Sequence, residues 1–160
     1  MLQPVQRMSK ILQRWVIAVF LASAFSLGAA EVRVVKVLPL LQDTKGRTAV
    51  APSLFERDAY QADLRRGKET AAGMIFQTQV KIKNAPAAPL KIKLEARPAT
   101  INDGTSFVTE QKLEKQTAFS GWISIAIGQV DWKKLKGVSA WRITIWEGDK
   151  MVAEQKSFLW

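Results

Sequence analysis

The sequence predicts a mainly β protein, an antiparallel β-sandwich of about seven strands with one short helix near residues 54–66. Three observations support this fold class. Several segments alternate between apolar and polar residues with a period of two, as half-buried strands do. Turn-forming residues separate these segments at short intervals. Cysteine is absent, so core packing without disulfides must hold the layers together.

The first strand is expected at residues 31–41, where β-branched side chains are frequent. Pro39 lies within this segment and cannot donate a backbone hydrogen bond, so we expect the strand at a sheet edge. Residues 42–52 are polar and contain Gly46 and Pro52, which indicates a loop. No catalytic residue is expected in that loop.

A helix is expected next, because Ser53 and Glu56 form the S-x-x-E capping box that satisfies free amide groups at a helix start. Apolar residues then recur three or four positions apart, at Phe55, Ala59, Tyr60 and Leu64. Gly67 supplies a left-handed cap at the other end. We expect this helix to cover one end of a sheet.

Two strands with basic outward positions follow, at 74–83 and 90–97. Their expected inward residues are Met74, Phe76, Val80 and Ile82 in the first and Leu90, Ile92, Leu94 and Ala96 in the second. Pro86 and Pro89 mark the turn between them, and we expect the two strands to pair as a hairpin. Their outward cations, Lys81, Lys83, Lys91, Lys93 and Arg97, would then form one patch opposed only by Glu95.

The remaining chain reads as four strands and a connector. A turn at Asn102, Asp103 and Gly104 precedes a strand at 106–113 and another at 122–127, with Ile123, Ile125 and Ile127 inward. A single helical turn is expected at 131–137, capped by Asp131 and Gly137. Two final strands, at 138–146 and 151–160, are expected to form a hairpin.

In the first strand of that final hairpin, period-two alternation divides the side chains between the core and the surface. Trp141, Ile143 and Ile145 are expected in the core opposite Phe76, Val80 and Ile92. Trp146 falls on the other face, so we assign it to the surface as a candidate binding residue.

The closing third carries a resemblance to known domains. AWRITIWEGDK followed by MVAEQKSFLW resembles the last hairpin of secreted bacterial immunoglobulin-like or fibronectin type III-like domains. Because cysteine is absent, the resemblance is to the relatives that lack the inter-sheet disulfide. It implies binding or adhesion more than catalysis, although a fold alone does not determine function.

The first 30 residues have the three regions of a secretory signal peptide: a basic stretch ending at Arg14, an apolar run, and small residues before Glu31. We therefore expect cleavage between Ala30 and Glu31, which leaves residues 31–160 as a single periplasmic or secreted domain. An uncleaved anchor is the alternative, but the apolar run is shorter than the roughly 20 residues that span a bilayer.

The charge balance predicts attraction to anionic surfaces. The chain has 24 basic and 14 acidic residues, and loss of Arg7, Lys10 and Arg14 with the signal segment leaves 21 basic residues and a net charge of +7. Such a balance favours contact with anionic polymers or lipids. Solubility alone is the other explanation of the same charge.

Catalysis and cofactor binding are not predicted. Histidine and cysteine are absent, which removes the commonest general base, thiolate nucleophile and zinc ligands. Two acidic pairs, Glu147 with Asp149 and Glu56 with Asp58, have structural explanations in a turn and a helix start. We therefore expect no catalytic residue, no metal and no cofactor.

The sequence thus predicts an exported, non-catalytic binding or assembly module of the cell envelope. Its candidate binding surface consists of Lys81, Lys83, Lys91, Lys93, Arg97 and Trp146. A protein or an anionic envelope polymer is the expected partner, with membrane contact only through the signal segment or surface charge. Nucleic acid is disfavoured because the two basic strands lack interleaved aromatic residues. A structural accessory subunit is the first alternative, and an enzyme of unfamiliar type is the second.

Overall fold

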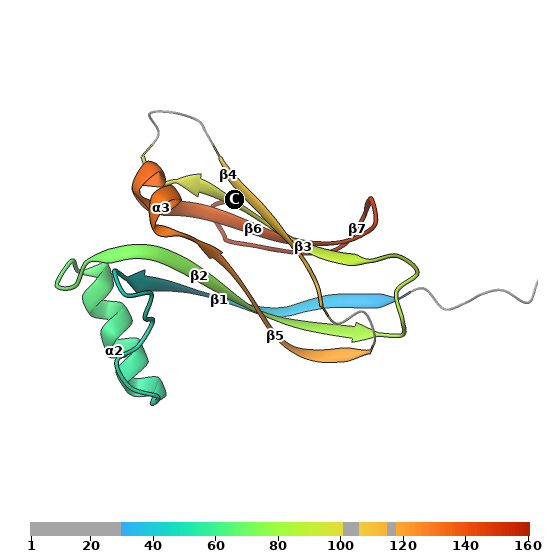
Figure 1. Cartoon of the computed structure of the whole chain (residues 1–160), viewed down its shortest axis with the longest axis horizontal. Coiled ribbons are helices and arrows are strands. Elements are labelled where there is room, and N and C mark those ends of the chain that lie inside the picture. The colour runs from blue at the N-terminus through green and yellow to red at the C-terminus, as the bar shows by residue number, and fades with distance from the viewer. Residues whose placement is uncertain (1–29, 101–105, 115–117) are drawn as a thin grey trace, which may run out of the picture.

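The computed structural model describes residues 30–100, 106–114 and 118–160, and in them seven strands form two antiparallel sheets (Figure 1). The three-stranded sheet has the order β1-β2-β5, with β1 at Glu31–Asp43, β2 at Ala71–Lys83 and β5 at Phe119–Ile127. The four-stranded sheet has the order β4-β3-β6-β7, with β4 at Phe107–Lys112, β3 at Leu90–Pro98, β6 at Val138–Glu147 and β7 at Lys150–Lys156. The predicted mainly β fold, an antiparallel β-sandwich of seven strands, is confirmed.

The core lies between the two sheets, where the inward residues of each strand meet. Its innermost side chains, all fully inaccessible to solvent, are Phe76, Val80, Leu90, Ile92, Leu94, Ala96, Ile127, Ile143 and Ile145. Trp141 is only partly buried, and its ring meets the Phe76 ring edge-on at a centroid distance of 5.7 Å. Ile143 and Ile145 are in the core as predicted, but Ile92 pairs with Ile145 within one sheet instead of facing it.

The predicted hairpin between residues 74–83 and 90–97 is wrong. These segments are β2 and β3, and they belong to different sheets: β2 pairs with β1 and β5, whereas β3 pairs with β4 and β6. The connection 84–89 therefore crosses from one layer to the other. A crossing and a hairpin leave the same apolar alternation in both strands, because each strand still faces the shared core.

Helix α2, Leu54–Arg65, connects β1 to β2 and starts as predicted. The Ser53 hydroxyl accepts a hydrogen bond from the Glu56 amide at 3.1 Å, and Gly67 takes the left-handed conformation with φ of 73°. The predicted apolar face is partly wrong, because Phe55 and Ala59 are exposed and only Tyr60 and Leu64 are buried. The first turn of α2 extends away from the sheet (Figure 1), and Phe55 in this turn is 84% exposed.

Helix α3, Gln129–Leu135, begins earlier than predicted. Gly128 is its N-cap and Lys136, with φ of 51°, is its left-handed C-cap, so Asp131 lies in the first turn instead of capping it. The final hairpin is confirmed, although β7 ends at Lys156 and not at residue 160. The signal segment, apart from Ala30, and the Asn102 to Gly104 turn lie outside the described residues. Neither described helix is long and apolar enough to span a membrane.

Candidate functional site

The structure divides the predicted binding surface between the two outer faces of the sandwich. Lys81 and Lys83 lie on β2 of the three-stranded sheet, whereas Lys91, Lys93 and Arg97 lie on β3 of the four-stranded sheet. The single patch predicted from a β2–β3 hairpin is therefore wrong. Trp146 lies opposite Lys91 in the pairing of β6 with β3, so four of the six predicted residues share the outer face of the four-stranded sheet.

Neighbouring strands add further charges to that face. Arg142 of β6 lies opposite Glu95, Lys112 of β4 lies opposite Lys91, and Lys156 of β7 lies opposite Arg142. We call this surface the basic face, and its cations are Lys91, Lys93, Arg97, Lys112, Arg142 and Lys156. Its carboxylates are Glu95, Glu110 and Glu154. Cations therefore outnumber anions by two to one.

Glu95 organises the centre of the basic face. Its carboxylate oxygen Oε2 accepts from Arg142 Nε at 2.7 Å and Nη2 at 2.6 Å, while Lys93 Nζ lies 3.4 Å from Oε1. The Glu95 side chain is only 15% exposed. Longer ion pairs join Lys91 to Glu110 at 3.6 Å and Arg142 to Glu154 at 3.7 Å.

Three cations of the basic face remain available to a partner. Within the described residues, no carboxylate lies in ion-pairing distance of Arg97, Lys112 or Lys156. The Arg97 guanidinium instead lies 4.3 Å from the centroid of the Trp160 ring, and Arg142 lies 4.9 Å from the same ring. Stacking on an aromatic ring leaves the guanidinium charge and its N–H donors free to contact an anion.

Sequence reasoning left the position of Trp160 open and did not place it beside Arg97. The reason is that residues 157–160 leave the strand and turn, with the Trp160 amide donating to the Ser157 carbonyl oxygen at 3.2 Å. Trp146 was correctly placed outside the core, but it is only partly exposed and its Nε1 donates to Thr144 Oγ1 at 2.8 Å.

A second polar cluster, around Asp43, was not found from the sequence. Asp43 Oδ1 accepts from the amides of Lys45 and Arg47, both at 2.8 Å, and Oδ2 accepts from Arg47 Nε at 2.7 Å and the Tyr60 hydroxyl at 2.8 Å. Burial raises the pKa of Asp43, but these hydrogen bonds outweigh it and hold the pKa well below its usual value. The same bond to Asp43, with burial, raises the pKa of Tyr60. A carboxylate with both oxygens so occupied serves to anchor α2 and the loop after β1.

The free edge of β1 is covered by a side chain. The Gln61 amide accepts from the Leu41 amide and donates to the Leu41 carbonyl oxygen, both at 2.8 Å, and also donates to the Thr48 carbonyl oxygen at 2.9 Å. Gln61 thereby imitates a neighbouring strand at the end of β1. This satisfies backbone groups that an edge strand otherwise leaves open.

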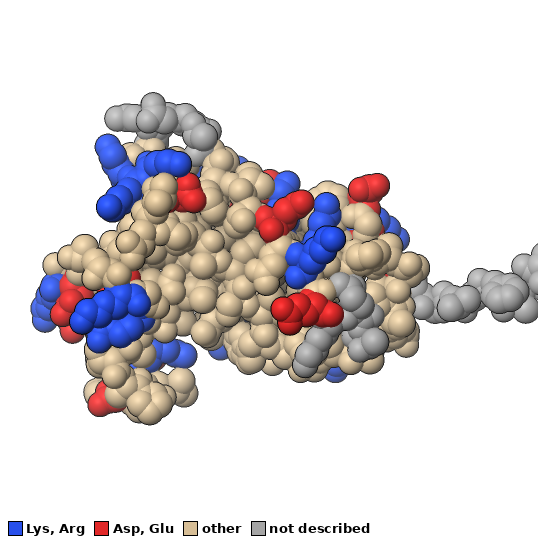
Figure 2. Space-filling view, in the orientation of Figure 1, with Lys and Arg blue, Asp and Glu red and all other residues tan. Residues whose placement is uncertain are grey.

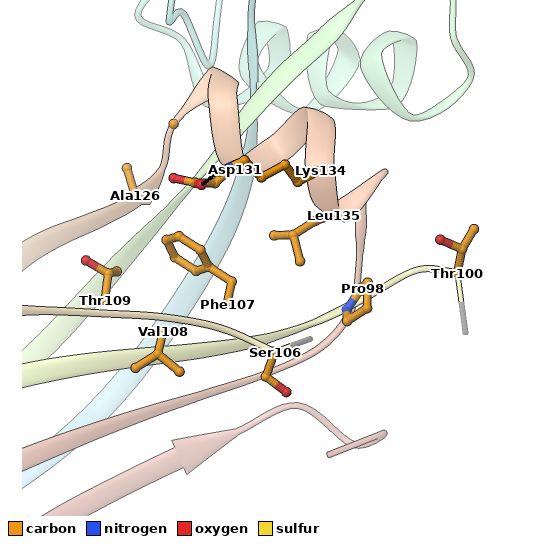
Figure 3. A pocket seen from close by; sticks show the side chains of 11 residues that line it. Pro98, Thr100, Ser106, Phe107, Val108, Thr109, Ala126, Asp131, Lys134 and Leu135 are labelled. Atoms are coloured by element: carbon orange, nitrogen blue, oxygen red, sulfur yellow. Dashed lines mark hydrogen bonds and ion pairs between the residues drawn. The ribbon is translucent and has the colours of Figure 1, made fainter. Parts of the chain in front are cut away.

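A pocket of about 690 Å³ opens between β4, β5 and α3 (Figure 3). Phe107 and Leu135 point into it, and Asp131 at its rim pairs with Lys134 at 3.3 Å. Figure 2 shows this side of the molecule, where the middle is mostly uncharged and charges gather toward the ends. Within the described part of the chain, no three acidic residues converge in a way that would hold a metal ion.

No protein-family model and no curated protein matches the chain. Among solved structures, an immunoglobulin-like protein from Pseudomonas aeruginosa is 17% identical over 81% of this chain and 96% of that one, with a TM-score of 0.36. A beta-glucosidase from Kluyveromyces marxianus is 8% identical over 81% of this chain and 14% of that one, also with a TM-score of 0.36. A beta-D-glucoside glucohydrolase from Trichoderma reesei is 12% identical over 80% and 18%, with a TM-score of 0.35. We draw no functional conclusion from similarities at these scores.

Proposed function

We propose that the chain is an exported, non-catalytic binding module of the cell envelope, and that its basic face contacts an anionic polymer bearing phosphate or carboxylate groups. The observation that carries this proposal is that Arg97, Lys112 and Lys156 have no carboxylate partner among the described residues. They lie around a network of ion pairs on the same face. Six cations and three carboxylates share this sheet face, where a polymer can contact several cations at once.

The geometry favours an extended anionic partner over a small one. The unpaired cations lie on three different strands, β3, β4 and β7, so the basic face spans the whole width of its sheet. Neighbouring strands are roughly 4.8 Å apart, which separates the two edge strands by about 14 Å. A single phosphate cannot reach both edges, whereas a polymer with repeated charges can.

The test compares two charge reversals of equal size on opposite faces. The double variant Lys112→Glu with Lys156→Glu changes the basic face, and Lys36→Glu with Lys81→Glu changes the other sheet by the same net charge. Retention on immobilised lipopolysaccharide and on lipoteichoic acid is measured at increasing salt. We expect the first variant to lose most of its retention, and the parent to elute earlier as salt shortens the screening length from about 10 Å at 0.1 M.

The control variant distinguishes a specific face from net charge alone. If both double variants lose retention equally, total charge explains the binding and the basic face has no special role. If the parent is retained on neither polymer at low salt, the proposal is wrong and a structural accessory role is the better explanation. Thermal melts of both variants establish that the fold is intact, since all four substituted residues are exposed.

A further inference from the structure

The five tryptophans in the described part of the chain differ in whether they have a partner. Trp141 contacts Phe76, Trp146 bonds to Thr144, Trp160 stacks with two arginines, and Trp132 Nε1 donates to the Ala71 carbonyl oxygen at 3.0 Å. Within the described residues, Trp122 alone has no hydrogen bond, ring contact or cation stacked on it. Its indole N–H and much of its ring are therefore available to a ligand.

Trp122 lies on β5, at the free edge of the three-stranded sheet, and points away from the core. Its neighbours in sequence, Gly121 and Ile123, fall on the inward side, and Ile123 packs against the core. Trp122 is 49% exposed, which is high for so large an apolar side chain. An exposed tryptophan of this kind needs an explanation when nothing in the fold uses it.

Most side chains around Trp122 on this face are neutral hydrogen-bonding groups, and the exception is Lys81, which lies opposite Ser120. Gln79 lies directly opposite it on β2, Gln77 pairs with Ser124, and Ser120 and Ser124 flank it on β5. Directly opposite residues of antiparallel strands have Cβ atoms roughly 5 Å apart, so these groups surround the indole. None of the four makes a side-chain hydrogen bond within the described part of the chain. They offer two amides and two hydroxyls, each both donor and acceptor.

A hollow lies beside the indole, on the open side of the sandwich. Trp122 and Ser124 line a pocket of about 340 Å³ together with Gln111 and Glu114 from the end of β4 and the residues after it. This volume lies within the range of pockets that hold small ligands. The indole therefore borders both a flat sheet face and a concave space.

We propose that Trp122 is a stacking platform for a sugar ring of an uncharged glycan, with Gln77, Gln79, Ser120 and Ser124 bonding to its hydroxyl groups. A pyranose ring has an apolar face of C–H groups that packs on an aromatic ring, and hydroxyls at its edge that bond to amides and hydroxyls. Both requirements are met at this point of the three-stranded sheet. These residues lie on the three-stranded sheet, whereas the basic face lies on the other sheet and reaches the hollow beside Trp122 through Lys112.

The test is affinity electrophoresis of the full-length chain in gels that contain hydroxyethylcellulose, laminarin or dextran. We expect at least one of these uncharged polymers to retard the chain. Trp122→Ala should raise the dissociation constant at least about tenfold, and Trp122→Phe should retain part of the affinity because it keeps an aromatic face. Val108→Ala is the matched control, since Val108 is 50% exposed on the other sheet.

Retardation must persist at roughly 0.5 M salt, where exposed charges are screened, whereas binding through the basic face must not. The variant Lys156→Glu, on β7 and away from the hollow, should be retarded as much as the parent when each mobility is compared with that in a gel without polymer. Retardation by none of the polymers, retardation unchanged in Trp122→Ala, or retardation abolished by salt would each overturn the proposal. If Trp122→Ala does not fold, Gln79→Ala decides, with a loss of affinity expected in a chain that retains its native circular dichroism.

Discussion

On the four-stranded sheet the outward charges are joined through a largely buried glutamate, whereas on the three-stranded sheet they are joined through an exposed one. Glu95 is held by Arg142 and Lys93 at the centre of one face, while on the other face Glu31, at the start of β1, pairs with Lys83 at 2.8 Å and with Arg33 at 3.4 Å. The tryptophans follow the same division, since the Trp146 and Trp160 side chains have polar partners and the Trp122 side chain has none among the described residues. Similar alternating strands therefore produce two different surfaces, because the strand that lies alongside supplies the partners.

The largest expected effect on stability comes from the loss of a core side chain that lies between the two sheets. Phe76→Ala should lower the free energy of unfolding by roughly 3–5 kcal/mol, because it removes a fully buried ring and leaves a cavity between the sheets. Urea denaturation monitored by circular dichroism measures this loss. Val35→Ala, at a position that is 51% exposed, should change the same quantity by less than about 0.5 kcal/mol. Equal free energies of unfolding for the two variants would show that the two sheets do not pack against each other at Phe76.

The facing of most strand residues could be predicted from the sequence, but their sheet partners could not. Leu90, Ile92 and Leu94 are inaccessible to solvent, as their alternation with polar residues predicted. The alternation says only that a strand has a buried side. Long-range packing decides whether the chain after Lys83 turns back to pair within the same sheet or crosses to the other sheet. The predicted patch of five cations therefore combined residues from opposite faces.

Side-chain contacts over long separations were the other feature that the sequence did not reveal. Asp43 and Gln61 look like ordinary loop and helix residues, yet one is 4% and the other 1% exposed. Each bonds to groups that are 17 to 20 residues away along the chain. Phe55, in contrast, fits the helical period of the buried face but is 84% exposed, because the sheet does not extend beneath it.

A smaller effect on stability, which depends on pH, is expected where Asp43 anchors α2 and the loop after β1. The pKa of Asp43 is lower in the folded chain than its unfolded value of about 3.9. The ionised carboxylate therefore stabilises the fold fully above that value, and this contribution is lost as pH falls through the folded pKa. Asp43→Asn should be less stable than the parent at pH 7, and its stability should fall less steeply below about pH 4.

Thermal melts of Asp43→Asn from pH 7 to pH 2 measure this difference. Asp63→Asn is the control, because the Asp63 carboxylate is exposed to solvent and pairs with Lys68 at 3.5 Å on the surface of the same helix region. The control should follow the parent across the whole pH range. A parallel decline of the parent and Asp43→Asn in acid would mean that the Asp43 hydrogen bonds do not favour ionisation in the folded state.

The smallest effect tests the difference between the two faces directly. Glu95→Gln should lower the free energy of unfolding by about 1 kcal/mol, because it weakens two charge-assisted hydrogen bonds from Arg142 at a side chain that is 15% exposed. Glu31→Gln removes a carboxylate that is 48% exposed, where solvent and salt screen its pairing with Lys83, and should have less effect. Urea denaturation at low and high salt compares the two variants. An equal loss in both would mean that the joined charges of the four-stranded sheet are no stronger than isolated pairs, whereas a larger loss in Glu95→Gln that persists at high salt supports a preorganised basic face.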